Sequence, residues 1–204
     1  MDKAGEIRRF WFGDLDDSRK IDRKQPPASL WFRAGSQFDE DIRRRFEEDL
    51  VKARSGQYRD WENTSEGKLV LVLLFDQFTR NIYRNTPAMY GDDPRALRIV
   101  LQGLEDRDDR RLQLVERVFF YMPLMHVEDI QIQKMCVQCF ETLVEDSRKM
   151  SPKNSDYFGY NLNYARRHRD IIERFGRFPH RNAILGRMTT PEESKFLKEK
   201  DSAF

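Results

Sequence analysis

Apolar residues recur every three or four positions along most of the chain, which is the spacing of amphipathic helices. Residues 69–75 are continuously apolar, and composition alone does not distinguish a buried strand from a helix there. The apolar stripe continues through Phe78 and Ile82 at helical spacing, so we predict one helix from about Gly67 to Tyr83. The other predicted helices cover about residues 42–51, 94–103, 111–121, 127–144 and 156–175.

Capping residues and prolines mark several ends of these helices. Asp93 followed by Pro94 predicts an N-cap and a first turn, and Gly176 is placed to end the helix before it. Pro123 is expected to interrupt the helix that starts near residue 111. The capping box Thr190–Glu193 predicts a further, terminal helix. Because no Asn-Gly hairpin or alternating strand occurs, we predict an all-α fold of antiparallel helical hairpins in a single domain, residues 1–204.

Composition restricts the class of protein. The 37 basic and 35 acidic residues nearly cancel, which argues against a general polyanion binder and against nucleic acid as a partner. The start of the chain lacks the apolar core of a signal peptide, and the longest apolar run, residues 69–75, is too short to cross a bilayer. We therefore expect a cytoplasmic protein with no membrane partner. The only cysteines, Cys136 and Cys139, lack the further ligands of a zinc site and are interpreted as small buried residues of one helix.

The first candidate for chemistry is a polar face on the predicted helix 67–83. Asp76, Arg80 and Arg84 lie at helical spacing, so a carboxylate and two guanidiniums share one side of a helix that is otherwise apolar. One interpretation is an Asp76–Arg80 ion pair at the protein surface. The other is a charged patch that lines a cleft.

All 3 histidines lie in the second half of the chain, each beside charged residues. His126 precedes Glu128 and Asp129, which we place at a helix N-terminus where the dipole favours neutral imidazole. His168 lies on an aromatic stripe of the helix 156–175, so it is either a functional residue or a hydrogen-bonded core residue. No His pair has the spacing of a known metal motif, so no metal is assigned, and the cofactor is left open.

The third candidate is an arginine-rich segment, residues 166–187. It holds seven arginines and no lysine, against Asp170 and Glu173. Arginine without lysine is typical of planar, bidentate pairing with carboxylate or phosphate. The aromatic residues between the arginines also fit RNA binding, but the near-neutral charge of the whole chain argues against it.

Four blocks of the sequence resemble the uncharacterised family known as domain of unknown function 924: Phe10–Gly13, Leu74–Arg84, Tyr121–Asp129 and Arg167–Asn182. The resemblance covers nearly the whole chain, and it implies an all-α domain similar to tetratricopeptide-like right-handed helical arrays, with no settled activity. Thr79 stands where the family usually has proline, and Val127 where it usually has serine. The first departure leaves open whether the helix bends near Asp76, and with it the direction of Arg80 and Arg84.

Three hypotheses follow. The first is a binding module whose polar patch receives an anionic small molecule or an acidic peptide end. The second is a hydrolase or transferase for a phosphate- or carboxylate-bearing metabolite, with histidine as acid or base and Glu128 or Asp129 orienting His126. A metal-assisted version of this hypothesis places a metal between two or three of the histidines. In the third, the charges hold the loop 177–182 against the helices by buried ion pairs. The candidate ligand-binding residues are Asp76, Arg80, Arg84, His126, Glu128, His168, Asp170, Arg177, His180 and Arg181.

Overall fold

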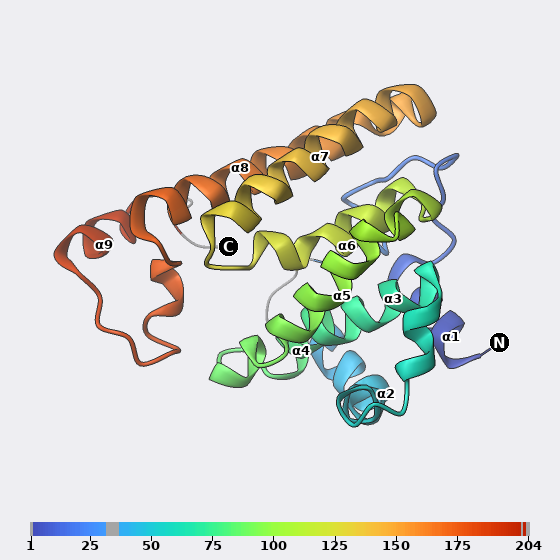
Figure 1. Ribbon diagram of the computed structural model, residues 1–204, viewed down its shortest axis with the longest axis horizontal. Helices are drawn as coiled ribbons and strands as arrows, with labels where there is room; N and C mark the ends of the chain where they lie inside the picture. Colours follow the sequence, from blue (N-terminus) through green and yellow to red (C-terminus); the bar gives the residue numbers. More distant parts are fainter. Residues whose placement is uncertain (1, 32–36, 201, 203–204) are drawn as a thin grey trace.

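The computed structural model describes residues 2–31, 37–200 and 202. Within these ranges the chain forms α-helices, short 3-10 turns and one π-helical segment, with no strand, so the all-α prediction is confirmed (Figure 1). The α-helices are α1 (Lys3–Phe12), α2 (Gln37–Arg54), α3 (Ser65–Val72), α4 (Thr79–Ile82), α5 (Asp93–Glu105), α6 (Leu114–Met125), α7 (Ile130–Met150), α8 (Ser155–Phe175) and α9 (Pro191–Phe196). The short elements are η1 (Arg59–Asn63), η2 (Leu73–Phe78), η3 (Pro87–Tyr90), η4 (Asp108–Arg111), η5 (Pro152–Asn154) and η6 (Pro179–Arg181).

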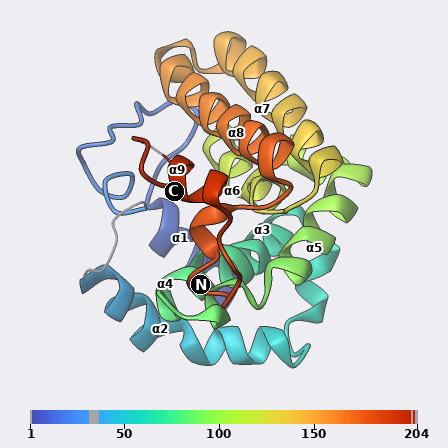
Figure 2. The same cartoon turned by 90° about the vertical axis from the view of Figure 1, so that its left-hand side faces the viewer.

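The two longest helices, α7 and α8, form an antiparallel pair along one edge of the molecule (Figures 1 and 2). The side chain of Asp129 starts α7 by accepting hydrogen bonds from the backbone N–H groups of Gln131 and Ile132. Gly176 ends α8 in the left-handed conformation, with φ of 68°. The chain then turns back through η6 toward α4 and η3 before it reaches α9 (Figure 1). This return brings the arginine-rich segment to the Asp76 helix.

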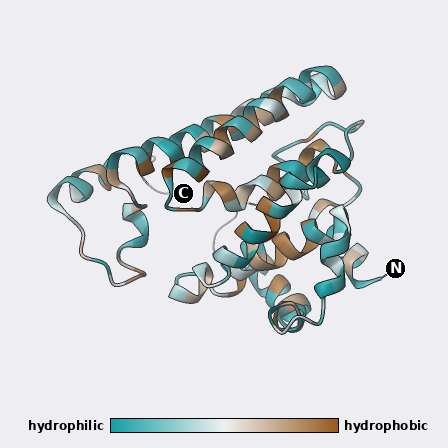
Figure 3. Cartoon of the chain, in the orientation of Figure 1, coloured by the Kyte–Doolittle hydropathy of each residue, from teal (hydrophilic) through white to brown (hydrophobic). Residues whose placement is uncertain are grey.

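The main hydrophobic core lies under α3 and α6, where the most apolar ribbon segments meet (Figure 3). Trp11 of α1 packs edge-on against Phe119 of α6, with ring centroids 5.5 Å apart, and contacts Phe78 at 5.4 Å. Helix α5 approaches α6 so closely that a Cβ atom on Gly103 would lie 2.6 Å from Cζ of Phe120. A separate small cluster of Ile171, Ile172 and Phe178 supports the loop after α8.

Three details of the predicted elements are wrong. Helix α6 runs through Pro123 to Met125 although Pro123 has no backbone N–H to donate. Leu124 and Met125 are buried, and they continue the packed face of the helix beyond the proline. Helix α5 starts one residue earlier than expected, so Asp92 occupies the N-cap position and Asp93 lies in the first turn. His126 lies at the C-terminal end of α6, where the helix dipole does not favour the neutral imidazole. Helix α1 was not predicted at all.

The predicted helix 67–83 is continuous but contains the π-helical segment η2. The backbone N–H of Thr79 donates to the carbonyl of Leu74, five residues back, and the Thr79 hydroxyl donates to the same carbonyl at 3.0 Å. The helix register therefore changes at Asp76 although the proline expected by resemblance is absent. Such one-turn π segments are frequent at functional sites.

None of the helices in the described ranges is both long enough and apolar enough to cross a membrane. Cys136 is fully buried and Cys139 partly buried on α7, and both are free thiols. The right-handed superhelical course, the single domain and the cytoplasmic location stay predictions.

Candidate functional site

Asp76 is the centre of a group of buried charges. Its side chain is 0% exposed, so the surface ion pair considered for Asp76 and Arg80 is instead a buried one. One carboxylate oxygen, Oδ1, lies 2.6 Å from Nδ1 of His126 and 3.2 Å from Arg80, while Oδ2 accepts from the amide of Gln77. Burial opposes ionisation, but Arg80 and His126 outweigh it and hold the pKa of the Asp76 carboxyl below its usual range. Asp76 is therefore an ionised carboxylate that accepts hydrogen bonds from its neighbours.

Arg80 is held by three hydrogen bonds to protein groups. It donates two parallel hydrogen bonds to the carboxylate of Asp93 on α5, at 2.7 and 3.1 Å. It also donates to the backbone carbonyl of Asp76 at 3.1 Å. Two carboxylates and one carbonyl thus hold this guanidinium, in the bidentate geometry typical of strong arginine pairs.

Arg181 of η6 faces the same carboxylate but is held differently. Its side chain is 8% exposed, and its ion contact with Asp93 is long, at 3.7 Å. The central carbon of its guanidinium lies over two rings, 4.6 Å from the centroid of Tyr90 and 4.5 Å from that of Phe178. Its Nε is buried, and no N–H of the side chain has a hydrogen-bond acceptor among the described residues. Burial and the charge of Arg80 lower the pKa of Arg181 from its ordinary value.

The three histidines lie at the other side of this group. The ring centroids of His126 and His168 are 6.3 Å apart, and Phe178 lies 5.4 Å from His168 and 5.6 Å from His180. Nδ1 of His168 is 2.9 Å from the carbonyl of Tyr164. Burial lowers the pKa of all three imidazoles, with Arg80 adding to the effect at His126 and Arg181 at His180, whose pKa falls to about 4.

We call this group the polar cluster. Its members form a closed circuit of contacts in which His126 is joined to Asp76, Asp76 to Arg80, Arg80 to Asp93, Asp93 to Arg181, Arg181 to Phe178, Phe178 to His168, and His168 back to His126. Four segments of the chain supply it: the π-helical turn with α4, η3 with the start of α5, the end of α6, and α8 with η6. The cluster consists of Asp76, Arg80, Tyr90, Asp93, His126, His168, Phe178, His180 and Arg181.

A second set of ion pairs holds the loop after α8. The Glu128 carboxylate accepts two hydrogen bonds from Arg187, at 2.7 and 3.0 Å, and one from the backbone N–H of Phe178 at 2.8 Å. Arg177 donates two bonds to Glu193 at 2.6 and 2.9 Å. Glu193 also forms the capping box with Thr190 that was predicted from the sequence. The loop is therefore tied at both ends by charges outside the polar cluster.

The structure brings together six of the ten predicted site residues: Asp76, Arg80, His126, His168, His180 and Arg181. Arg84 instead pairs with Asp39 on α2, with N–O distances of 2.6 and 2.9 Å. Asp170 is exposed and pairs with its neighbour Arg169. Arg177 and Glu128 belong to the ion pairs that hold the loop after α8. Ligand binding by any of these residues stays a prediction.

Sequence reasoning missed Asp93, Tyr90 and Phe178, and it assigned the partner of His126 to Glu128 or Asp129. The carboxylate that contacts His126 is Asp76, fifty positions earlier in the chain. Asp93 carried a signal, an acidic residue beside Pro94, but that signal also fits a helix cap. Phe178 and Tyr90 carried no signal beyond their aromatic character.

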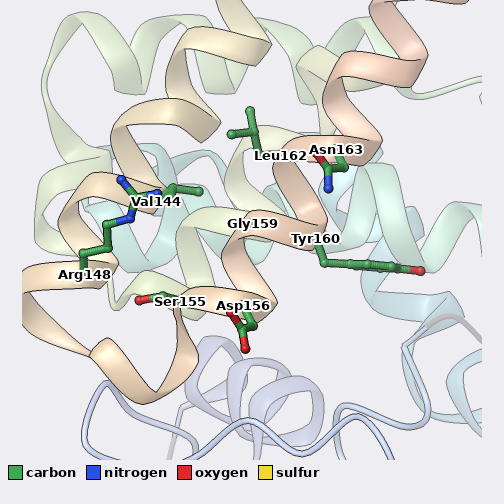
Figure 4. Close-up of a pocket in the computed structure, with 8 residues that line it drawn as sticks. All are labelled: Val144, Arg148, Ser155, Asp156, Gly159, Tyr160, Leu162 and Asn163. Carbon is green, nitrogen blue, oxygen red and sulfur yellow. The ribbon is translucent and has the colours of Figure 1, made fainter.

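Two shallow pockets lie apart from the polar cluster. One, of about 550 Å³, lies between α7 and α8, with Arg148, Asp156 and Tyr160 among the residues that line it (Figure 4). The other, of about 500 Å³, adjoins Asp109, Tyr121 and Cys139. Within the described ranges, no three side chains of the His, Cys, Asp or Glu type are grouped closely enough to hold a metal ion.

The chain is similar to proteins that have no assigned activity. The family model of the bacterial proteins of unknown function called DUF924 matches residues 7–201. A solved structure of a protein of unknown function from Agrobacterium tumefaciens is 36% identical, covers 97% of each chain and superposes with a TM-score of 0.78. No curated protein matches.

Proposed function

The chain belongs to the bacterial DUF924 family, and we propose that in this member the polar cluster binds a small anionic molecule or the acidic end of a peptide. In this proposal Arg181 meets the anion, the two carboxylates fix the arginines, and the histidines surround the bound group. Four separate segments of the chain support a common site, because each contributes a charged or imidazole side chain to one circuit of contacts.

The single observation that carries the proposal is the state of Arg181. A guanidinium has five N–H donors, and a buried donor without an acceptor costs free energy. Arg181 is buried, has no hydrogen-bond acceptor among the described residues, and shares with Arg80 a carboxylate that Arg80 already occupies in bidentate geometry. A carboxylate or phosphate oxygen would supply the missing acceptors and offset the buried charge.

The contacts of Tyr90 and Phe178 add to this argument. Both rings lie close to the Arg181 guanidinium, with centroids 4.6 and 4.5 Å from its central carbon. A guanidinium edge is the side that pairs with carboxylate and phosphate. The side chain is thus oriented before any ligand arrives, which reduces the entropy lost on binding.

Calorimetric titration of the full chain with inorganic phosphate and with succinate tests the proposal. We expect saturable binding of at least one of the two anions. Replacing the guanidinium in Arg181→Met is expected to weaken that binding by about tenfold or more, the effect of losing hydrogen bonds to a charged group. Arg166→Met is the matched control, because Arg166 is an exposed arginine of α8 that pairs with Glu141. Equal binding by both variants would contradict the proposal.

The second candidate is an enzyme, a hydrolase or transferase for a phosphate- or carboxylate-bearing metabolite. The specific observation in its favour is the 2.6 Å contact between Asp76 and Nδ1 of His126. A buried carboxylate on one imidazole nitrogen fixes the ring and leaves the other nitrogen to accept a proton from water or a hydroxyl group.

Turnover of p-nitrophenyl phosphate and p-nitrophenyl acetate tests this candidate. If His126 acts as a base, His126→Asn lowers kcat by about a hundredfold or more, the usual contribution of general acid–base catalysis. The same substitution leaves kcat unchanged if His126 only binds. If the native protein hydrolyses neither compound faster than buffer alone does, the result counts against the enzyme hypothesis.

A further inference from the structure

The hydrogen-bonding state of His126 restricts what the polar cluster accepts. Asp76 is ionised and accepts hydrogen bonds only, and its Oδ1 lies 2.6 Å from Nδ1 of His126. The hydrogen of the neutral imidazole is therefore on Nδ1, which leaves a lone pair on Nε2. No described residue donates a hydrogen bond to Nε2, so this nitrogen is an acceptor without a donor.

The arginines of the cluster have the opposite requirement, since a guanidinium only donates. Arg181 and His126 lie on the same circuit, linked through Phe178 and His168 by ring distances of 4.5, 5.4 and 6.3 Å. Together with burial, the positive charge of Arg181 helps to lower the pKa of His168, whose ring centroid is 6.3 Å from that of His126. A molecule bound among these side chains meets donors at Arg181 and an acceptor at His126.

We propose that the ligand is an anion that also carries a hydroxyl group, with the anionic oxygens on the edge of Arg181 and the hydroxyl donating to Nε2 of His126. This inference rests on the proposed anion site and names the class of molecule that the site takes: a hydroxy acid or the phosphate ester of a polyol. Both share the chemistry of an anionic group close to a hydroxyl.

The same surroundings disfavour an ammonium group as the donor. Arg80 lies 3.2 Å from the Asp76 carboxylate that His126 also contacts, so a second cation at Nε2 would be placed beside an existing one. Neither nearby carboxylate is available to offset it, because Arg80 engages both Asp76 and Asp93. A neutral hydroxyl meets the acceptor without this repulsion.

Paired ligands that differ in the hydroxyl group test the proposal on the native protein by calorimetry. Malate is compared with succinate, and glycerol 3-phosphate with propyl phosphate, so that the two pairs also distinguish a carboxylate from a phosphate. We expect the hydroxylated member of at least one pair to bind roughly 3- to 10-fold more tightly, the range of one net hydrogen bond. Equal affinity within both pairs, or tighter binding of the members without the hydroxyl, overturns the inference but leaves the anion site intact. If no member of either pair binds, the proposed anion site fails and this inference fails with it.

Two measurements assign the preference to His126. In His126→Phe an aromatic ring remains but the nitrogen acceptor is removed. The two members of each pair are therefore expected to bind this variant with about equal affinity, and the member without the hydroxyl is expected to bind as it does to the native protein. Retained preference in a folded variant overturns the inference. Nitrogen-15 NMR of the native protein does not depend on the variant: at neutral pH we expect the proton of His126 on Nδ1, and a proton on Nε2 instead would also overturn it.

Discussion

Arg80 and Arg181 contact the same carboxylate, yet we expect opposite consequences when each is replaced by methionine. Arg80→Met removes three hydrogen bonds and leaves Asp76, which is 0% exposed, and the largely buried Asp93 without their main counter-charge. Breaking a buried ion pair from one side costs roughly 3–5 kcal/mol of the free energy of unfolding. Arg80→Met is therefore expected to destabilise the protein severely.

Arg181→Met removes no hydrogen bond to a described residue and only one long ion contact of 3.7 Å. The substitution gives up two cation–π contacts, each of about 1–2 kcal/mol, and the thioether replaces part of this by packing on Tyr90 and Phe178. It also removes the cost of keeping a cation out of water, which is about several kcal/mol for a buried ion. These effects nearly cancel, so we expect a free energy of unfolding within about 1 kcal/mol of the native value, or above it.

Urea denaturation followed by tryptophan fluorescence measures both variants, because Trp11 and Trp31 are buried in the core. Arg166→Met controls for the loss of an arginine on the surface. If Arg181→Met loses as much stability as Arg80→Met, the expected difference between the two arginines is refuted. Such a result would mean that Arg181 stabilises the fold instead of being available to bind a ligand.

Two other predictions concern acid and the loop after α8. Because the pKa of His180 in the folded protein is about 4, below its ordinary value of 6.5, the unfolded chain binds the proton first as the pH falls. The stability that depends on neutral His180 is complete above about pH 6.5 and is lost toward pH 4, and at pH 5 the free energy of unfolding has fallen by about 2 kcal/mol for this reason. In His180→Gln this part of the acid-induced loss is absent, so urea titrations at about pH 7 and pH 5 should show a drop in the free energy of unfolding that is smaller by about 2 kcal/mol than in the native protein. Glu128→Gln weakens the tie to Arg187 and the N–H of Phe178, so amide exchange in residues 176–190 should accelerate, about tenfold or more, whereas Glu141→Gln, at an exposed pair, should leave exchange there unchanged.

The sequence was sufficient to predict the helices that follow α1 and most of the residues that come together in the polar cluster. Apolar periodicity located the helices, because a helix that packs on one side must repeat its apolar residues every three or four positions. The polar residues that interrupted this pattern on buried helices, Asp76 and His168, proved to be buried as well. A charged residue within an apolar stripe has to find a partner inside the protein, and this made the convergence of separate segments predictable.

The partners themselves could not be predicted. The π-helical turn at η2 depends on one extra residue in a helical turn, which leaves the apolar pattern almost unchanged but alters the direction of Asp76. Asp93 beside Pro94 has the same appearance whether its carboxylate caps a helix or pairs with Arg80. His126 was assigned to the nearest carboxylates in sequence, but the fold places it against one from another helix. Pairing of charges is decided by tertiary geometry, and sequence distance is a poor guide to it.

The two sets of charges after α8 explain why Arg181 is left with unused donors. Residues 177–190 are fixed by Glu128 with Arg187 and by Arg177 with Glu193, so the loop keeps its place without a bond from Arg181. If Arg181 were needed to hold the loop, packing of the chain would have brought its guanidinium onto a carboxylate at hydrogen-bond distance, as it does for the other arginines of the loop. The fold instead carries Arg181 into the polar cluster on a segment secured by other residues. A buried cation on a rigid support that it does not itself stabilise is the arrangement expected of a residue that acts on a ligand.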